Sequence, residues 1–235
     1  SSNQINNLTS FQFASSPIKN CVFSMSYLIL TSNQLNFLPF SYFSNFVNLK
    51  VLRLNKNSIS FIENFVFSNL KQLDMLDLSE NKIQSLQPEL FDNLQNLRTL
   101  NLEKNSMKIL PPELLANLKK LELLNLSSNF LSSNWINFMT FKNLFNLRLL
   151  DLSYNKLTSL ENSIFSDLTS LEMLDLKNNL IENIAMDTFA NLSSLTSLVL
   201  SHNFIKNVNF SLNSLSNLNV LSLDFNEIYT VEKHL

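Results

Sequence analysis

Leucines at alternate positions recur along the chain at a nearly constant interval. Nine Leu-x-Leu pairs are present, and the step between them is 24 residues in most cases, 26 once and 23 once. Alternate residues of a strand point to the same face, so each pair predicts a short strand with one buried face. Because a full circuit of chain separates the pairs, the strands must stack in parallel. The pairs are Leu28/Leu30, Leu52/Leu54, Leu76/Leu78, Leu100/Leu102, Leu124/Leu126, Leu150/Leu152, Leu174/Leu176, Leu198/Leu200 and Leu221/Leu223.

An asparagine follows each pair three residues after its second leucine. An amide side chain has two N–H donors and a carbonyl acceptor, so it can bridge the backbones of adjacent turns where it is buried. The pattern therefore predicts a structural ladder of asparagines rather than a set of catalytic groups. Its members are Asn33, Asn57, Asn81, Asn105, Asn129, Asn155, Asn179, Asn203 and Asn226.

The second half of each repeat carries further apolar anchors, many of them phenylalanine. Spacings of three to five residues suit short helical or 3₁₀ turns on the side opposite the strands. We expect most of the 20 phenylalanines to form a core spine. An aromatic cage for a ligand is the alternative at these positions. The central anchors are Phe43, Phe67, Phe91, Leu115, Phe165, Phe189 and Leu212.

The repeat LxxLxLxxNxLxxLPxxxFxxLxx resembles the 24-residue class of animal extracellular leucine-rich repeats, and Toll and Toll-like receptor ectodomains are most similar in character. The resemblance covers residues 25–235. It implies an α/β fold: a right-handed, horseshoe-shaped solenoid with short parallel strands on the concave face and loops or short helical turns on the convex face. We expect one domain over 1–235, with a partial repeat at 1–24 and nine repeat starts beyond it. Both ends lack the Cys-rich caps of such ectodomains, which suggests a window cut from a longer solenoid.

Positions that differ between repeats are candidates for binding, because the leucines and asparagines are committed to the core. The strand residue between the two leucines faces the concave side, and the residue before each ladder asparagine lies at the strand end. Aromatic residues in this second column are typical interface anchors. A solvated charged face is the alternative for the charges, and packing over neighbouring turns is the alternative for Phe130 and Phe204. The candidate ligand-binding residues are Tyr154, His202, Phe225, Arg53, Lys56, Glu80 and Lys104.

Two irregular places depart from the repeat. The 26-residue unit contains SSNWINFMTF at 132–141, where either Trp135 or Ile136 fills a core slot, or the insertion forms a protruding contact loop. Cys21 is the single cysteine, so it is either a small buried residue or a partner for a cysteine elsewhere.

Composition narrows the function. The net charge of −2 gives no general attraction to nucleic acid or to an anionic membrane, and no apolar run is long enough to cross a bilayer. Glycine is absent while asparagine occurs 37 times, so part of the asparagine excess is expected to replace glycine at turns with positive φ. With two histidines, one cysteine and no catalytic or metal-binding motif, we expect no enzyme, no cofactor and no metal site. Four N-x-[ST] sequons make Asn7, Asn125, Asn191 and Asn209 candidate glycosylation sites.

The resemblance therefore implies a non-catalytic module in the extracellular ligand-recognition region of a Toll-like receptor, innate immune or developmental. Its partner would be a protein or microbial ligand on the concave face or lateral edge, with receptor dimerisation a further expectation and no membrane contact by this segment. Two alternatives stay open: a secreted or membrane-anchored adhesion protein of the same repeat class, and an intracellular scaffold or effector.

Overall fold

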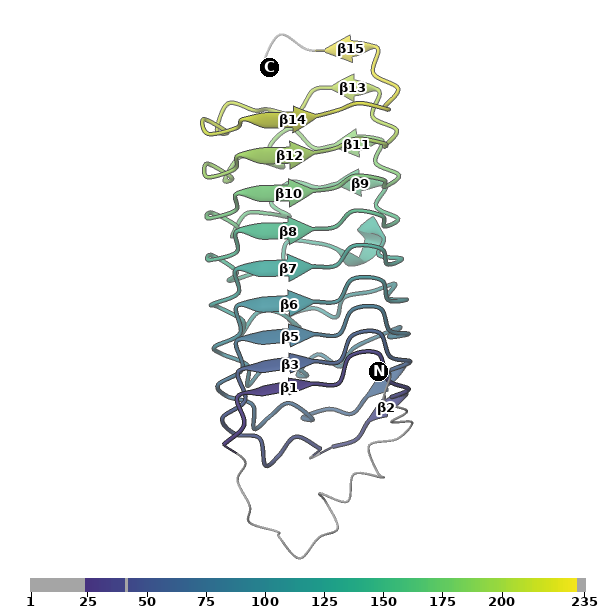
Figure 1. Ribbon diagram of the computed structural model, residues 1–235. Coiled ribbons are helices and arrows are strands. Elements are labelled where there is room, and N and C mark those ends of the chain that lie inside the picture. Colours follow the sequence, from purple (N-terminus) through teal and green to yellow (C-terminus); the bar gives the residue numbers. More distant parts are fainter. Residues whose placement is uncertain (1–23, 41, 232–235) are drawn as a thin grey trace, which may run out of the picture.

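The computed structural model describes residues 24–40 and 42–231, which form a solenoid built around one long parallel sheet (Figure 1). Nine strands are neighbours in the order in which they occur along the chain. They are β1 (Tyr27–Ile29), β3 (Val51–Arg53), β5 (Met75–Asp77), β6 (Thr99–Asn101), β7 (Leu123–Asn125), β8 (Leu149–Asp151), β10 (Met173–Asp175), β12 (Ser197–Val199) and β14 (Val220–Ser222).

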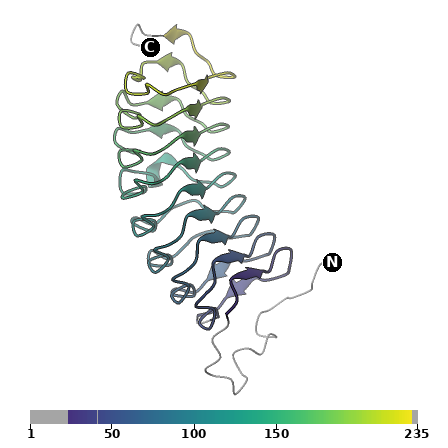
Figure 2. The ribbon, with the colours of Figure 1, turned by 60° about the vertical axis from the view of Figure 1, so that its left-hand side comes forward.

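The repeat sets the register of this sheet. Leu150 pairs with Leu124 on one side and with Leu174 on the other, so the first leucine of each repeat faces the first leucine of its neighbours. The same register holds across the 26-residue step, because the two additional residues lie outside the strands. The chain winds as a right-handed coil, and the stack curves with the sheet on its inner side (Figure 2). The predicted fold class is confirmed.

The outer side of each turn is made of short extended pieces and tight turns, with almost no helix. Six two-residue strands pair two by two in parallel: β2 (Phe37–Leu38) with β4 (Phe61–Ile62), β9 (Ser159–Leu160) with β11 (Asn183–Ile184), and β13 (Asn207–Val208) with β15 (Thr230–Val231). Beyond them, backbone bonds between residues three apart, such as Leu70 N–H to Phe67 O at 2.9 Å, form the turns. Across the described residues a single 3₁₀ helix occurs, η2 (Ser133–Trp135).

Leucines from the strands and phenylalanines from the outer side fill the core. Eight phenylalanines of the described residues are buried and eight are exposed, so the expectation that most phenylalanines belong to the core is wrong for this part of the chain. Phe43, Phe67 and Phe91 stack in sequence with ring centroids 6.0 and 6.3 Å apart, and Phe141, Phe165 and Phe189 form a second stack. Leu115 occupies the position between the two stacks. These rings are fully buried, so the alternative of an aromatic ligand cage at these positions is wrong.

In the 26-residue unit one residue of the insertion fills a core slot and its neighbour lies on the surface. Ile136 is 2% exposed and fills the core slot, while Trp135 is 51% exposed at the end of η2. The longer repeat is therefore accommodated without loss of core packing, and it places an aromatic side chain on the surface. Asn7, Cys21 and residues 1–23 of the predicted partial repeat lie outside the described residues. In the part of the chain that the structure describes, no helix is long and apolar enough to cross a membrane.

Candidate ligand-binding surface

The asparagine ladder forms the rigid edge on which the candidate residues stand. The Nδ2 of Asn155 donates to the carbonyl of Leu126 in the preceding turn at 3.0 Å and to that of Leu152 in its own turn at 3.1 Å. Its Oδ1 accepts from the backbone N–H of Leu131 at 3.0 Å. From Asn57 to Asn226 each ladder asparagine makes the equivalent set of bonds, so one amide bridges two turns at each step.

The residue before each ladder asparagine has a left-handed backbone, with φ between 49° and 57°. This conformation costs a residue with a Cβ roughly 1–3 kcal/mol, and glycine avoids that cost. Asn178 is the single asparagine in this column and Asn143 is another with positive φ, so asparagine takes the place of glycine at a small part of these turns. Here the amides serve the ladder instead, and the strained position accepts many side chains: Ser32, Lys56, Glu80, Lys104, Ser128, Tyr154, Asn178, His202 and Phe225.

The three predicted aromatic residues lie on this edge as one pair and one separate ring. The rings of His202 and Phe225 stack with centroids 4.2 Å apart and planes 8° apart. Tyr154 stands two turns away from His202 and is 54% exposed, while Phe225 is 72% exposed. Phe130 and Phe204, one residue after their ladder asparagines, are also exposed. The C-terminal half of the edge therefore presents exposed aromatic surface.

The four predicted charged residues do not gather into one site. Lys56 lies 3.8 Å from Glu80, and Lys104 pairs with Glu103 at 3.0 Å, while Arg53 faces outward from β3. The hydrogen bond and the charge of Glu103 raise the pKa of Lys104. Exposed ion pairs of this kind contribute little to stability, so these charges modulate a surface rather than define a pocket.

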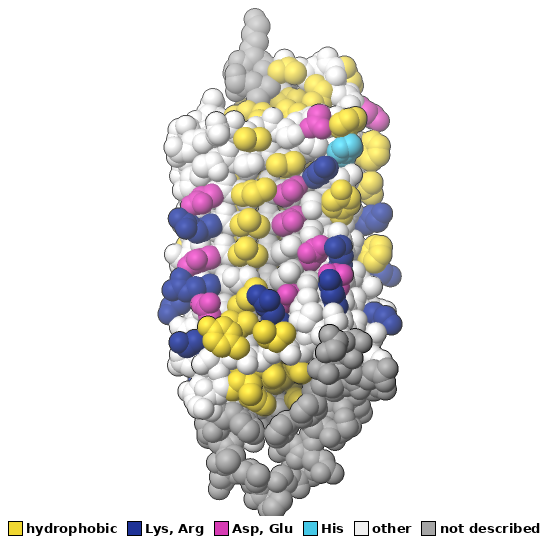
Figure 3. Space-filling model, in the orientation of Figure 1, with side chains coloured by type: hydrophobic (Ala, Val, Ile, Leu, Met, Phe, Trp, Pro, Cys, Tyr) yellow, Lys and Arg dark blue, Asp and Glu magenta, His cyan; other side chains and the backbone are white. Residues whose placement is uncertain are grey.

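A second outward-facing column was missed by the sequence reading. The residue immediately before the first leucine of each pair faces the same side as the residue between the leucines, because strand side chains alternate. The alternation of side chains along each strand was therefore sufficient to predict this second column from the sequence. This apolar stripe runs up the sheet (Figure 3) and comprises Tyr27, Val51, Met75, Leu123, Leu149, Met173 and Val220, with Thr99 and Ser197 as polar members.

Acidic and amide side chains run beside the apolar stripe at the last residue of the five central strands, β5, β6, β7, β8 and β10. Their oxygens accept from backbone N–H groups two residues later, as Asp151 Oδ1 does from Ser153 at 2.9 Å and Asn125 Oδ1 from Ser127 at 2.9 Å. Asp151 and Asp175 are in register on neighbouring strands. Burial raises the pKa of the Asp175 carboxyl, and the Asp151 charge adds to that effect, against a lowering by the Lys177 N–H and charge.

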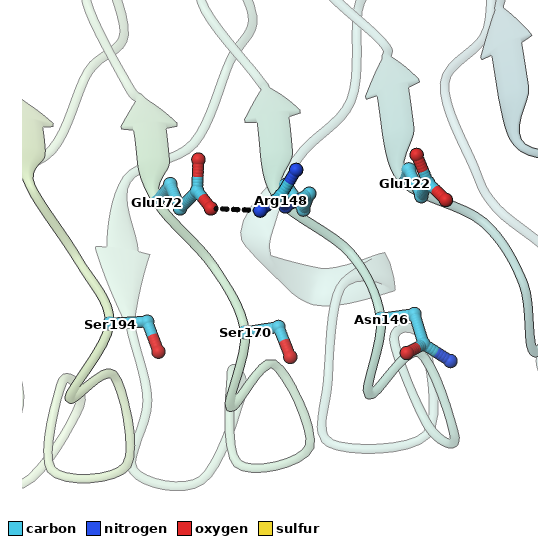
Figure 4. A pocket seen from close by; sticks show the side chains of 6 residues that line it. All are labelled: Glu122, Asn146, Arg148, Ser170, Glu172 and Ser194. Atoms are coloured by element: carbon cyan, nitrogen blue, oxygen red, sulfur yellow. Dashed lines mark ion pairs between the residues drawn. The ribbon is translucent and has the colours of Figure 1, made fainter.

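A shallow polar pocket of about 320 Å³ lies on the opposite edge, where the chain enters the strands. Figure 4 shows the Arg148 guanidinium and the Glu172 carboxylate facing each other across neighbouring turns, 2.8 Å apart, above Ser170 and Ser194. Arg98 similarly contacts both Asp74 and Glu122. Charges of alternating sign along this edge therefore neutralise one another.

Three of the four sequons lie within the described residues. Asn191 and Asn209 are exposed, and Asn191 Nδ2 donates to the carbonyl of Ser166 in the preceding turn at 3.0 Å. Asn69, Asn96, Asn146 and Asn217 reach back in the same way, so a second set of asparagines bridges the turns away from the main ladder. Asn125 is half-buried on β7, within the concave sheet.

Comparison with known proteins places these features in context. A family model described as leucine rich repeat matches residues 24–83, 75–131, 136–181 and 169–228. A search of curated proteins found no match.

Several solved structures contain a similar chain. One is the glycosylated Toll–Spatzle complex of Drosophila, with 28% identity, a TM-score of 0.81, and coverage of 89% of this chain and 30% of that one. The TLR13–ssRNA13 complex has 33% identity and a TM-score of 0.78, covering 86% and 29%. The ectodomain of the Arabidopsis thaliana receptor kinase GASSHO1/SCHENGEN3 has 24% identity and a TM-score of 0.70, covering 88% and 26%, and shares the fold alone. The chain thus spans less than a third of each of these proteins.

Proposed function

Since the chain belongs to the leucine-rich repeat family, we propose that it is a non-catalytic part of the extracellular ligand-recognition region of a Toll-like cell-surface receptor. Such a receptor would act in signal transduction, in innate immunity or development. The similarity to chains of the Toll and TLR13 complexes, which extends over 86–89% of this chain, is the observation that carries the proposal.

The surface chemistry supports recognition of a polypeptide. A long rigid sheet presents outward side chains that differ from turn to turn, beside an edge with the exposed aromatics Tyr154 and Phe225. Rigid aromatic side chains give contact area at low entropic cost. Arg53, Lys56, Glu80, Lys104 and His202 would tune that surface by charge and hydrogen bonding. The same edge is where a second receptor copy would pack on dimerisation.

The Toll and TLR13 neighbours differ in what they bind: Spatzle in one complex, single-stranded RNA in the other. For this chain a polypeptide fits better, because the net charge is −2 and the concave face carries Asp151 and Asp175, which form no ion pair with any described residue. A polyanion would be repelled there.

Two other functions fit the same fold. An adhesion protein would carry a lipid-anchor signal or a stop after a Cys-rich cap in its full-length gene. A Toll-like receptor would instead carry a transmembrane helix and a cytoplasmic signalling domain. An intracellular scaffold would have no signal peptide.

Passage of the whole chain through a secretory pathway tests the extracellular assignment. We expect a mass increase that a glycosidase removes, with Asn191 and Asn209 occupied, because both side chains are exposed and glycosylation leaves Asn191 one N–H for its bond to Ser166. Asn191→Gln and Asn209→Gln variants identify the sites. Unmodified asparagines at every sequon would count against an extracellular location.

A further inference from the structure

We infer that the concave face over β7, β8 and β10 binds a basic, amphipathic helical segment of a partner polypeptide. This inference deepens the proposed function and rests on it only in assuming that the concave face binds a ligand. Two adjoining columns carry it: the apolar residues Leu123, Leu149 and Met173, and the carboxylates Asp151 and Asp175 (Figure 3).

The apolar column is uncovered among the described residues. Leu123, Leu149 and Met173 are each only half-buried, although they belong to three adjacent, central strands of the sheet. Contiguous exposed apolar surface rimmed by polar groups is typical of interaction sites. The spacing of strands, about 4.8 Å, is close to the roughly 5–6 Å between residues three or four apart on a helix. An extended segment, with about 6.7 Å between alternate residues, matches these rows less well.

The carboxylates select a basic partner. The fold does not need their charge, because Asn101 and Asn125 make the same bond to the backbone in the preceding turns with an amide oxygen. Two carboxylates in register on neighbouring strands repel each other. A lysine or arginine from a partner would relieve that repulsion.

No cation of the described residues forms an ion pair with Asp151 or Asp175. Lys177 nevertheless lies near enough to attract Asp175 electrostatically. By contrast, Arg148 on the adjoining edge is paired with Glu172. The face over these strands is therefore apolar and acidic, which complements a segment that is apolar and basic.

Binding of synthetic peptides to the full chain tests the inference. The probes are a 14-residue Leu/Lys peptide with helical apolar periodicity, a scrambled peptide of the same composition without an apolar face, a Leu/Glu counterpart and a 14-nucleotide single-stranded RNA. Asn125 lies on this face, so the protein is made without glycans. We expect the patterned Leu/Lys peptide to bind at least about tenfold more tightly than each other probe at ~0.1 M salt.

Matched variants locate the site. Asp151→Asn with Asp175→Asn should weaken peptide binding about tenfold, and Leu149→Ala should weaken it several-fold. Glu161→Gln with Glu182→Gln removes the same two charges from exposed positions outside the nine-stranded sheet and should change binding less than twofold. Asp77→Asn, which changes the same column on β5, should also have little effect.

Several outcomes would overturn the inference. They are absence of peptide binding at 1 mM, equal binding of the scrambled peptide or of RNA, and equal weakening by the two double variants. If Tyr154→Ala, His202→Ala and Phe225→Ala together abolish binding, while the variant with Asp151→Asn and Asp175→Asn still binds normally, the peptide binds at the edge. That result rejects the concave site but leaves the proposed receptor function standing, since the glycosylation test bears on that function separately.

Discussion

At the residue scale, the asparagine side chain is what joins one turn to the next. It supplies donor and acceptor in one group, so a single residue satisfies backbone atoms of two turns at once, and the ladder positions from Asn81 to Asn203 are buried. The residue before it takes the left-handed conformation that lets the chain leave the strand. The candidate binding residues of this column therefore lie on left-handed backbone directly beside the ladder.

Removing one ladder amide should destabilise the protein measurably. Asn155→Ala leaves the Leu131 N–H without its side-chain partner and removes one of the two amide donors to the Leu126 carbonyl, which keeps Asn129, so it should cost about 1–3 kcal/mol. Lys156→Ala, at the next position with an exposed side chain, should stay within about 0.5 kcal/mol of the wild type. Chemical denaturation measures both, and equal midpoints for the two variants would contradict the ladder.

The strained column offers a second comparison at a single site. At Tyr154, where φ is 55°, glycine should give a protein about 1 kcal/mol more stable than alanine does, because alanine keeps the Cβ penalty. Both variants remove the same ring, so their difference isolates the backbone. Thermal melts are sufficient, and an alanine variant as stable as the glycine variant would argue against strain here.

At the element scale, each strand of the nine-stranded sheet has three residues, whose outer two face the concave side, and the middle residue is buried in the seven strands from β3 to β12. Cross-strand neighbours on that face are close enough to interact strongly. Like charges on β8 and β10 are thus a feature of the pairing and not of either strand alone.

Replacing one of these charges should stabilise the sheet in a pH-dependent way. The pKa of Asp175 in the folded protein is raised above its ordinary 3.8, so ionisation of this carboxyl disfavours the folded state. Below about pH 4 the protonated carboxyl does not destabilise the fold, and this advantage in the free energy of unfolding is lost as the pH rises through the folded pKa. Asp175→Asn should therefore be about 0.2–1 kcal/mol more stable than wild type at pH 7. The gap should close toward pH 3.5. Urea denaturation at both values measures it, and a gap that widens in acid would reverse the assignment.

At the scale of the whole molecule, the solenoid is a linear stack in which each turn packs on its neighbours. Stability in such proteins is approximately a sum of repeat and interface contributions. A core residue in a central turn contributes to both of the interfaces around it.

The phenylalanine stack makes this testable. Phe165 is buried and stacks on Phe141 at 6.0 Å and on Phe189 at 6.3 Å, so Phe165→Ala should cost about 3–5 kcal/mol. Phe138→Ala removes an exposed ring from the adjacent repeat and should cost less than about 0.5 kcal/mol. Guanidinium denaturation compares the two; similar midpoints would mean that the stacked rings carry no special share of the stability.

The sequence by itself determined the repeat, the parallel strands and the place of the asparagines. Each of these depends on residues within one repeat and on a period, so Leu150, Leu152 and Asn155 already imply a strand and the turn that follows it. The identity of the edge column followed from the same spacing. The period of two also specifies the apolar column with Leu123, Leu149 and Met173, because these residues lie two positions before the residues between the leucines.

Only the tertiary structure decided what neighbouring turns do to each other. His202 and Phe225 are 23 residues apart, yet their rings stack, and Asp151 and Asp175 become a repelling pair. It also placed Ile136 in the core and Trp135 outside, a choice the sequence left open. The physical reason is that these outcomes depend on register and packing between turns. The repeat spacing specifies which residues are adjacent on neighbouring turns, but it does not specify which side chain fits the space between those turns.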